Sequence, residues 1–409
     1  MRVLSVMRCE CAERVMIRRC HLMHNLRLLL RILELKAFRS LGFPAYPINF
    51  TISVTNKCNS RCKTCNIWKF RDYHDELDLE EYDHIFEKIG KNMYWATLSG
   101  GEPFLRDDIS HIYSALIEHC EPNIVNVPTN ATMPRLIERR VREMLEFRRT
   151  HDRKSFIEMK CSRGGSGRGG ARSALIINLS LDGVGDMHDW IRGFKNNFSR
   201  FIDTYKRLRA LKNEYDLKIG VHTVISIYNL NSIHEITEFV RGLGADTHIF
   251  EVAEEREELM TVGCKITPRA DSLSNALAEI MRSVRVHGDF ITRMTQSFRM
   301  EYYKMMKRVF EERRQVVPCY AGFASCQISP QGDVWACCVL GNTYSFGNLR
   351  ACNYDFNRIW RSARASEIRR AIKTGACYCP LANASYTNML CNFRSALSVL
   401  LRMICSYFA

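Results

Sequence analysis

Three cysteines lie close together in the segment KCNSRCKTCNIW, at Cys58, Cys62 and Cys65, with a CxxxCxxC spacing. Thiolate sulfur is the preferred ligand of iron–sulfur clusters, and a four-iron cluster held by only three thiolates keeps one iron open to another ligand. A structural zinc site would ordinarily close with a fourth cysteine or histidine, and the paired CxxC units of zinc ribbons are missing from this segment. The triplet therefore predicts a cluster with one open iron, with zinc as the alternative.

A second motif, TLSGGEPFLR, places Gly100, Gly101 and Glu102 after a short apolar run. Glycine has no Cβ, so the backbone at these positions can come close to a ligand and adopt unusual dihedral angles. In isolation the motif would be a tight strand-to-helix turn. Beside the cysteine triplet, it favours a ligand-binding loop.

Two further segments carry polar residues that could contact a ligand. The segment NLSLDGVGDMHDWIRG supplies Ser180, Asp182 and Arg192, and the segment VPTNAT supplies Asn130. The planar guanidinium of Arg192 suits bidentate pairing with a carboxylate. The alternative is that Asp182 only forms a turn and that Arg192 only forms a surface salt bridge.

The elements that must position these residues follow a repeated pattern of strand, loop and helix between residues 49 and 252. Such alternation is typical of βα units and a parallel sheet, and right-handed crossovers would curl the sheet into a barrel with its chemistry on the loops after the strands. We expect an α/β fold, a partial (β/α)6 barrel with a small cysteine-rich C-terminal domain. The expected strands are Asn49–Thr55, Met93–Leu98, Asn123–Val127, Ala174–Leu181, Leu217–Ile225 and Thr247–Val252, with helices beginning near Leu79, Asp107, Met133, Lys195 and Ser232.

The chain is expected to divide near residue 316, where a helical stretch gives way to a segment that is short, rich in cysteine and loop-like. Glycine, serine and arginine dominate residues 161–173, which indicates a flexible insertion. The expected parts are a basic amphipathic segment (1–47), the barrel (48–267), a helical connector (268–316), the cysteine-rich domain (317–395) and an amphipathic tail (396–409).

The cysteine-rich domain offers a second set of candidate ligands: Cys319, Cys337, Cys377, Cys379 and Cys391. Five cysteines suffice for one cluster, whereas two closed four-iron clusters need about eight ligands. We expect one auxiliary iron–sulfur cluster, and structural zinc is the alternative.

Together these motifs resemble the radical S-adenosylmethionine (SAM) superfamily, in which CxxxCxxC ends the first strand of the barrel. Two positions depart from the family pattern, because Thr64 stands where an aromatic residue is usual and Ala131 stands where glycine follows Asn130. The segment CYAGFASCQISPQGDVWACC, with GNL and RIW after it, resembles the start of the SPASM extension, which binds auxiliary clusters.

The resemblance implies a [4Fe-4S] cluster that binds S-adenosylmethionine, a second auxiliary iron–sulfur cluster, and a one-electron donor such as ferredoxin or flavodoxin. Reductive cleavage of S-adenosylmethionine would give a deoxyadenosyl radical that abstracts a hydrogen atom from a substrate. The resemblance also implies that the GGE motif, Asn130, Ser180, Asp182 and Arg192 lie around S-adenosylmethionine.

These motifs do not identify the substrate. Residues 24–43 and 392–409 are basic and leucine-rich and could form amphipathic helices on an anionic membrane, which suggests a lipid-linked substrate. The alternative, which we favour for these two segments, is that they pack on the barrel. One alternative is a maturase that modifies peptides or proteins. A second alternative is a non-catalytic iron–sulfur or zinc-binding interaction protein.

Composition narrows the location and the partners. The net charge is +15, but no helix-turn-helix, zinc-finger or RNA-binding motif accompanies it, so specific binding of nucleic acid is not expected. Charged residues interrupt the apolar stretches near the N-terminus, which excludes a signal-peptide core and a membrane-spanning helix there. We expect a cytoplasmic protein with peripheral contact at the inner membrane surface.

Overall fold

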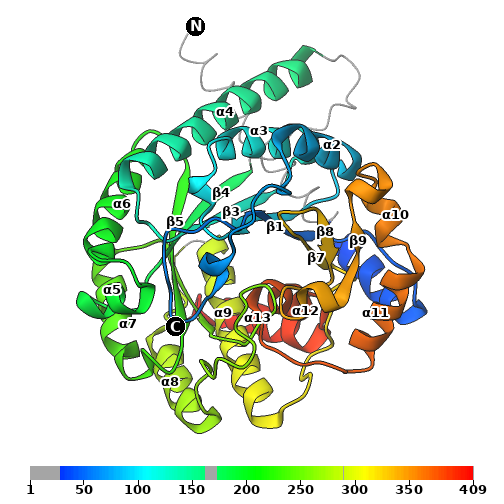
Figure 1. The fold of residues 1–409 in the computed structure, drawn as a ribbon. Helices are drawn as coiled ribbons and strands as arrows, with labels where there is room; N and C mark the ends of the chain where they lie inside the picture. The colour runs from blue at the N-terminus through cyan, green and yellow to red at the C-terminus, as the bar shows by residue number, and fades with distance from the viewer. Residues whose placement is uncertain (1–27, 162–172, 289, 409) are drawn as a thin grey trace, which may run out of the picture.

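The computed structural model describes residues 28–161, 173–288 and 290–408 (Figure 1). The first part of the expected N-terminal segment and nearly all of the expected insertion at 161–173 lie outside these residues. The described chain forms an α/β fold, as expected, and its strands form a single curved sheet. The order of the strands is β6-β5-β4-β3-β2-β1-β7-β8-β9.

Six parallel strands make up the barrel part of the sheet: β1 (Asn49–Thr55), β2 (Trp95–Gly100), β3 (Ile124–Thr129), β4 (Ala174–Ser180), β5 (Leu217–Ile225) and β6 (Thr247–Val252). The outer face of the sheet is apolar, as at Phe50 and Ile52 of β1, which are fully buried under the surrounding helices. Side chains alternate along a strand, so the residues between them share the inner face.

The inner face of the barrel is polar for most of its width. In-register pairing places Thr51 of β1 beside Thr97 of β2, and Thr97 beside Asn126 of β3. The polar residues of this face are Asn49, Thr51, Ser53, Thr97, Asn126, Asn178, Ser180, His222, Glu251 and Gln327. A wall of this kind suits a polar ligand better than an apolar one.

Helices cover the outside of the sheet, in blue to green in Figure 1. They begin within two residues of the expected positions, and α2 has a capping box in which Asp78 and Glu81 satisfy each other's backbone N–H. The helices are α2 (Leu79–Ile89), α3 (Ile109–Cys120), α4 (Pro134–Cys161), α5 (Asp186–Arg192), α6 (Asn197–Leu211), α7 (Ile233–Leu243), α8 (Ala270–Ser283) and α9 (Phe290–Glu312). A further helix occupies residues 28–41.

The segment after residue 318 has more regular structure than the sequence indicates. It contains three short strands and three helices where the sequence indicates loops: β7 (Ser325–Ile328), β8 (Asp333–Trp335), β9 (Ser345–Asn348), α10 (Phe356–Trp360), α11 (Ala363–Lys373) and α12 (Ala382–Cys391). The expected amphipathic helix at the end of the chain is α13 (Phe393–Cys405). Strand β7 pairs in parallel with β1, so this segment extends the sheet of the barrel. Strands of three or four residues are too short for a periodic pattern, which explains why the sequence did not reveal them.

Helix α12 lies against the inner face of the sheet. Asn49 of β1 donates from Nδ2 to the carbonyl of Asn383 (2.8 Å), and Asn383 donates from Nδ2 to Thr51 Oγ1 (3.0 Å). Helices α12 and α13 therefore occupy the side of the curved sheet that the outer helices leave open (Figure 1). No helix in the described part of the chain is both long and apolar enough to cross a membrane.

Candidate active site

The cysteine triplet lies on the loop that follows β1, and both the end of α5 and Glu76 hold this loop. The amides of Arg61 and Lys63 donate to the carbonyls of Arg192 (3.1 Å) and Ile191 (2.8 Å) at the end of α5. At the entry to the loop, Glu76 accepts from Thr55 Oγ1 (2.8 Å) and from a backbone amide. The fixed backbone brings the three thiols together.

The electrostatics of the thiols show that they are neighbours. Burial, and after it the nearby Cys62, raise the pKa of Cys58 to about 12. Burial and then Cys62 also raise the pKa of Cys65. Among residues 28–161, 173–288 and 290–408, no three His, Cys, Asp or Glu side chains are grouped to hold a single metal ion. A four-iron cluster places each thiolate on a separate iron, and so needs a wider spacing than one ion does.

Backbone amides distinguish several cysteines from the rest. At five cysteines a nearby backbone N–H further along the chain lowers the pKa of the thiol, and at Cys319 the amide of Ala321 donates to the sulfur (3.5 Å); the five are Cys58, Cys65, Cys319, Cys337 and Cys379. An N–H donor favours the charged thiolate, which is the form that binds metal. The donor set at the triplet and in the C-terminal segment therefore fits an iron–sulfur cluster.

Gly100 and Gly101 support the cysteine loop directly. A Cβ on Gly100 would lie 2.2 Å from the carbonyl oxygen of Thr55, and a Cβ on Gly101 would lie 2.3 Å from that of Lys57. The amide of Gly101 also donates to Thr55 O (2.7 Å). The close approach that the sequence attributes to a ligand is made here to the backbone of the loop itself.

Glu102 is fully buried and binds three groups of the protein. Its carboxylate accepts from the amides of Phe104 (3.1 Å) and Asn130 (2.7 Å) and from Thr129 Oγ1 (3.0 Å). Burial raises the pKa of Glu102 to about 7, although these donors lower it. The GGE motif thus ties the loop after β2 to the end of β3.

Asn130 connects the end of β3 to the cysteine loop. Its Nδ2 donates to Asn59 Oδ1 (2.7 Å), and its Oδ1 accepts from Thr132 Oγ1 (2.7 Å). The next residue, Ala131, adopts φ 61°, in the left-handed region that glycine favours. The loop therefore keeps the conformation that a glycine would give it, despite the alanine.

Asp182 and Arg192 form an ion pair beside the triplet. Arg192 Nη1 donates to Asp182 Oδ2 (3.0 Å), and the amide of Val224 donates to Asp182 Oδ1 (2.9 Å). Arg192 Nε is buried and has no hydrogen-bond partner within the described residues. Ser180 is half-buried at the end of β4, next to His222 on β5. The pair is buried, so the surface salt bridge considered as the alternative is wrong.

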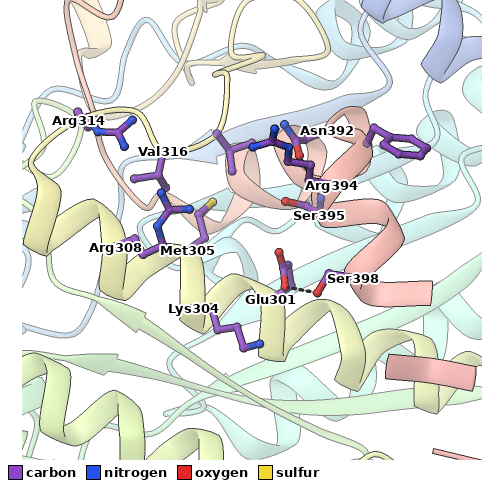
Figure 2. Close-up of a pocket in the computed structure, with 12 residues that line it drawn as sticks. Glu301, Lys304, Met305, Arg308, Arg314, Val316, Asn392, Arg394, Ser395 and Ser398 are labelled. Carbon is purple, nitrogen blue, oxygen red and sulfur yellow. Dashed lines mark hydrogen bonds between the residues drawn. The ribbon is translucent and has the colours of Figure 1, made fainter. Parts of the chain in front are cut away.

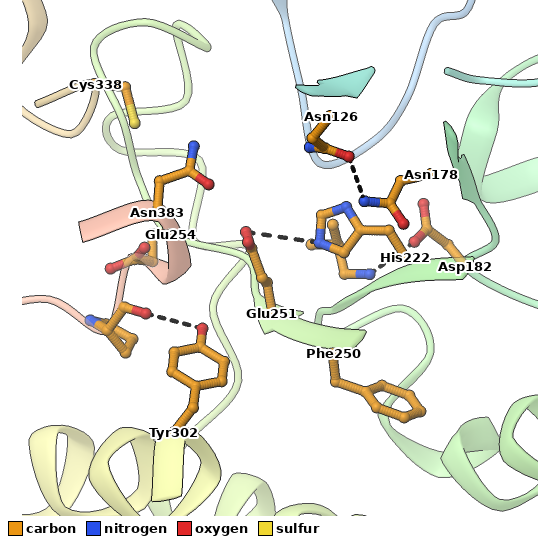
Figure 3. A network of polar contacts seen from close by, with 12 residues as sticks. Asn126, Asn178, Asp182, His222, Phe250, Glu251, Glu254, Tyr302, Cys338 and Asn383 are labelled. Carbon is orange, nitrogen blue, oxygen red and sulfur yellow. Dashed lines mark hydrogen bonds and ion pairs between the residues drawn. The ribbon is translucent and has the colours of Figure 1, made fainter. Parts of the chain in front are cut away.

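The mouth of the barrel contains a group of charged residues, in which Glu251 and Glu254 stand at the end of β6 as their positions in the sequence predict (Figure 3). Arg256 Nη2 lies 3.6 Å from Glu251 Oε2 and 3.3 Å from Glu254 Oε2, and His222 Nε2 lies 3.7 Å from Glu251 Oε2. Arg256 Nη1 also contacts Cys338 Sγ (3.9 Å). Burial raises the pKa of Glu254 to about 7, while Arg256 lowers it.

Four of the five candidate cysteines of the C-terminal segment lie together. After burial, Cys337 raises the pKa of Cys377, Cys377 raises that of Cys319, and Cys319 raises that of Cys337. Cys379 is affected by both Cys337 and Cys319. Cys391 lies elsewhere, in an apolar cluster with Ile32, Leu35 and other residues around the helix at 28–41. The expectation that Cys391 joins the other four is corrected, because the end of α12 turns its side chain toward that helix.

One loop connects the two sets of cysteines. Residues 253–267 follow β6, and within them the carbonyl of Leu259 accepts from the amide of Asn66 (2.9 Å), next to Cys65. The amide of Glu257 donates to the carbonyl of Val339 (3.1 Å), close to Cys337. The relative position of the two cysteine groups is therefore fixed by direct backbone contacts.

Comparison with known proteins identifies both parts of the chain. The model of the radical SAM superfamily matches residues 52–152, and the model of the SPASM iron–sulfur cluster-binding domain matches residues 319–380. The subtilosin biosynthesis protein AlbA of Bacillus subtilis is 23% identical over 76% of this chain and 59% of AlbA. The mycofactocin maturase MftC of Mycolicibacterium smegmatis is 19% identical over 81% of this chain and 74% of MftC.

Solved structures show the same fold. SuiB of Streptococcus suis, bound to its precursor peptide SuiA, matches with a TM-score of 0.52 and 16% identity, over 85% of this chain and 74% of SuiB. The protein anSMEcpe with bound AdoMet matches with a TM-score of 0.53 and 11% identity, over 89% of this chain and 96% of that protein. The match to AlbA covers less than two thirds of AlbA's own length. The chain therefore contains a radical SAM domain at residues 52–152 and a SPASM iron–sulfur cluster-binding domain at residues 319–380.

Proposed function

We propose that the protein is a radical SAM enzyme that modifies a peptide, with its catalytic [4Fe-4S] cluster on Cys58, Cys62 and Cys65. When bound, the cluster supplies one electron for the reductive cleavage of S-adenosylmethionine to a deoxyadenosyl radical, which removes a hydrogen atom from the substrate. The donor of that electron is proposed to be a ferredoxin or a flavodoxin. The convergence on one loop of three thiols, with Cys62 buried and Cys58 and Cys65 half-buried, supports this assignment.

The surrounding residues hold the loop and balance charge. Arg192 lies near Cys62 and Cys58 and has a free, buried Nε, so it can offset negative charge on the cluster or on the carboxylate of S-adenosylmethionine. Asp182 fixes the orientation of this guanidinium. Ser180, half-buried on the inner face, is free to contact the ribose. The remaining proposed S-adenosylmethionine contacts, Gly100, Gly101, Glu102 and Asn130, act by shaping the loop.

The SPASM domain is proposed to hold one closed auxiliary cluster through four cysteines: Cys319, Cys337, Cys377 and Cys379. Their mutual electrostatic coupling and the amide donors at three of them support this set. Structural zinc is the competing occupant, because four thiolates also satisfy zinc. The ratio of iron to zinc in protein purified without oxygen distinguishes the two.

A peptide fits the barrel better than the lipid-linked substrate suggested by the amphipathic segments. The observation that carries this choice is the polar inner face, where Asn178 Nδ2 donates to Asn126 Oδ1 (2.6 Å) and Gly220 leaves room for the Asn178 side chain. Amide side chains can exchange such bonds for bonds to a peptide backbone, whereas an acyl chain would leave them unpaired. The names of AlbA and MftC, and the peptide bound to SuiB, point to the same substrate class.

Reductive cleavage and peptide modification can be tested separately. Protein purified and reconstituted without oxygen is expected to form deoxyadenosine from S-adenosylmethionine under a strong reductant. A Cys58→Ala, Cys62→Ala, Cys65→Ala variant is expected to form none, whereas Cys405→Ala, at an exposed cysteine, should match the wild type. Co-expression with short peptides encoded beside the gene, followed by mass spectrometry, tests the substrate. A peptide that returns unmodified from a deoxyadenosine-forming enzyme would contradict the peptide assignment alone.

A further inference from the structure

Helix α13 exposes its apolar side to solvent. Its buried side is formed by Ser395, Val399 and Met403, which pack against α9. Its exposed side carries large apolar residues at positions i, i+4, i+7, i+8 and i+11 and beyond: Phe393, Leu397, Leu400, Leu401, Ile404 and Phe408. Phe393 is 70% exposed and Phe408 is 87% exposed. A surface helix ordinarily turns this stripe toward the core, so the apolar stripe of α13 is a candidate contact surface.

A basic cavity adjoins the N-terminal end of this stripe. It lies between α9 and α13, has a volume of about 730 Å³, and is open to solvent (Figure 2). Phe393 belongs both to the stripe and to the cavity wall. The charged residues of the wall are Glu301, Lys304, Arg308, Arg314 and Arg394.

Two of these cations have no counter-ion within residues 28–161, 173–288 and 290–408. Arg308 and Arg314 both pair with Glu312, and Glu301 accepts from Ser398 Oγ (2.8 Å). Lys304 and Arg394 have no ion pair among the described residues, and Figure 2 shows both on the cavity wall. The cavity therefore offers unpaired positive charge beside an apolar surface, the combination that binds an anionic membrane interface.

We propose that α13 and the adjoining cavity dock the enzyme on an anionic lipid bilayer. The apolar stripe enters the boundary between headgroups and acyl chains, and Lys304 and Arg394 contact the lipid phosphates. A second copy of the chain is a poorer occupant, because two-fold contact between copies of the stripe would bring their unpaired cations close together. The proposal is independent of the substrate and goes beyond the peptide-modifying function.

The test is co-sedimentation of the full-length protein with vesicles of phosphatidylcholine, alone or mixed with phosphatidylglycerol. The wild type is expected to bind the mixed vesicles at low salt and to be released by high salt. A Leu397→Asp, Leu401→Asp variant and a Lys304→Glu, Arg394→Glu variant are each expected to bind the mixed vesicles with an affinity lowered about ten-fold or more.

Matched controls separate the surface from general effects. Val262→Asp changes another apolar residue that is 68% exposed, and Lys218→Glu with Arg241→Glu changes the net charge as much as the cavity variant does. Both controls should bind like the wild type, and circular dichroism should show all variants folded. The proposal is overturned if the wild type ignores mixed vesicles, if the controls bind as weakly as the test variants, or if Leu397→Asp, Leu401→Asp instead converts a dimer to a monomer.

Discussion

Replacing Gly193 by alanine is expected to displace the loop that carries the three cysteines. Gly193 ends α5 with φ 60° and ψ 36°, and a Cβ there would lie 2.3 Å from the carbonyl oxygen of Arg61. Gly244 ends α7 in nearly the same conformation, with φ 71° and ψ 37°, but a Cβ there would meet nothing within 4 Å. The two glycines share the cost of the backbone conformation and differ only in the contact with the loop.

The magnitudes follow from that difference. A left-handed alanine costs about 1–2 kcal/mol at either position. At Gly193, overpacking against the Arg61 carbonyl adds about 1–3 kcal/mol, because the loop must move by about 1 Å to restore ordinary contact. We therefore expect Gly193→Ala to cost about 2–5 kcal/mol and Gly244→Ala about 1–2 kcal/mol.

The assay compares both variants with the wild type after reconstitution without oxygen. Thermal unfolding reports the free-energy cost, and iron content, visible absorption and deoxyadenosine formation report the loop. Gly193→Ala is expected to lose the catalytic cluster and deoxyadenosine formation, whereas Gly244→Ala should keep both. Equal iron content and activity in the two variants would refute the claim that contact with Gly193 positions the cysteine loop.

Three further predictions concern the other residues of the site. Cys337→Ser is expected to lower the iron content by up to one cluster, and Cys391→Ser is expected to leave the iron content unchanged. Equal losses of iron in the two variants would show that Cys391 is also a ligand. Burial holds the pKa of Glu254 at about 7, above its ordinary value of 4.5, so its contribution to stability is complete below pH 4.5 and is lost as the pH rises through 7. Glu254→Gln should therefore remove a decline of about 3 kcal/mol over this range, measured by denaturation at several pH values, and an unchanged pH profile would count against it. Ala131→Gly relieves about 1–2 kcal/mol of strain from the left-handed backbone and loses about 1 kcal/mol from burial of the methyl group. The two effects nearly cancel, so the thermal midpoint of unfolding should stay near that of the wild type. A large decrease in the midpoint would contradict this expectation.

The barrel could be predicted closely because its strands are long and buried. The bounds of β1, β5 and β6 agree with the sequence pattern, since each is a run of six or more residues with a clear outer apolar face. Strand β2 was placed two residues too early, because its pairing with β1 continues to Gly100, a residue with little intrinsic preference for a strand. Pairing with a neighbour, rather than local sequence, set this boundary.

The site residues that belong to a motif with a characteristic spacing could be predicted from the sequence. Those that are brought to the site only by the path of the folded chain could not. The triplet and Arg192 stand out by residue type and motif. Arg256 does not, because its importance comes from the loop of residues 253–267 that places it between two carboxylates and Cys338. Cys391 illustrates the reverse error, since the count of cysteines cannot show which way a helix turns a side chain.

The pairing of β7 with β1 has a consequence for how the chain folds. Strand β1 lies near the beginning of the barrel, and one of its edges is covered only by β7, which belongs to the SPASM domain at the far end of the sequence. During synthesis one row of backbone N–H and C=O groups of this buried strand stays unpaired until most of the chain, including β7, has left the ribosome. The SPASM domain is therefore not a detachable module, and a chain cut near residue 316 should aggregate through the exposed edge of β1 rather than persist as an independent barrel.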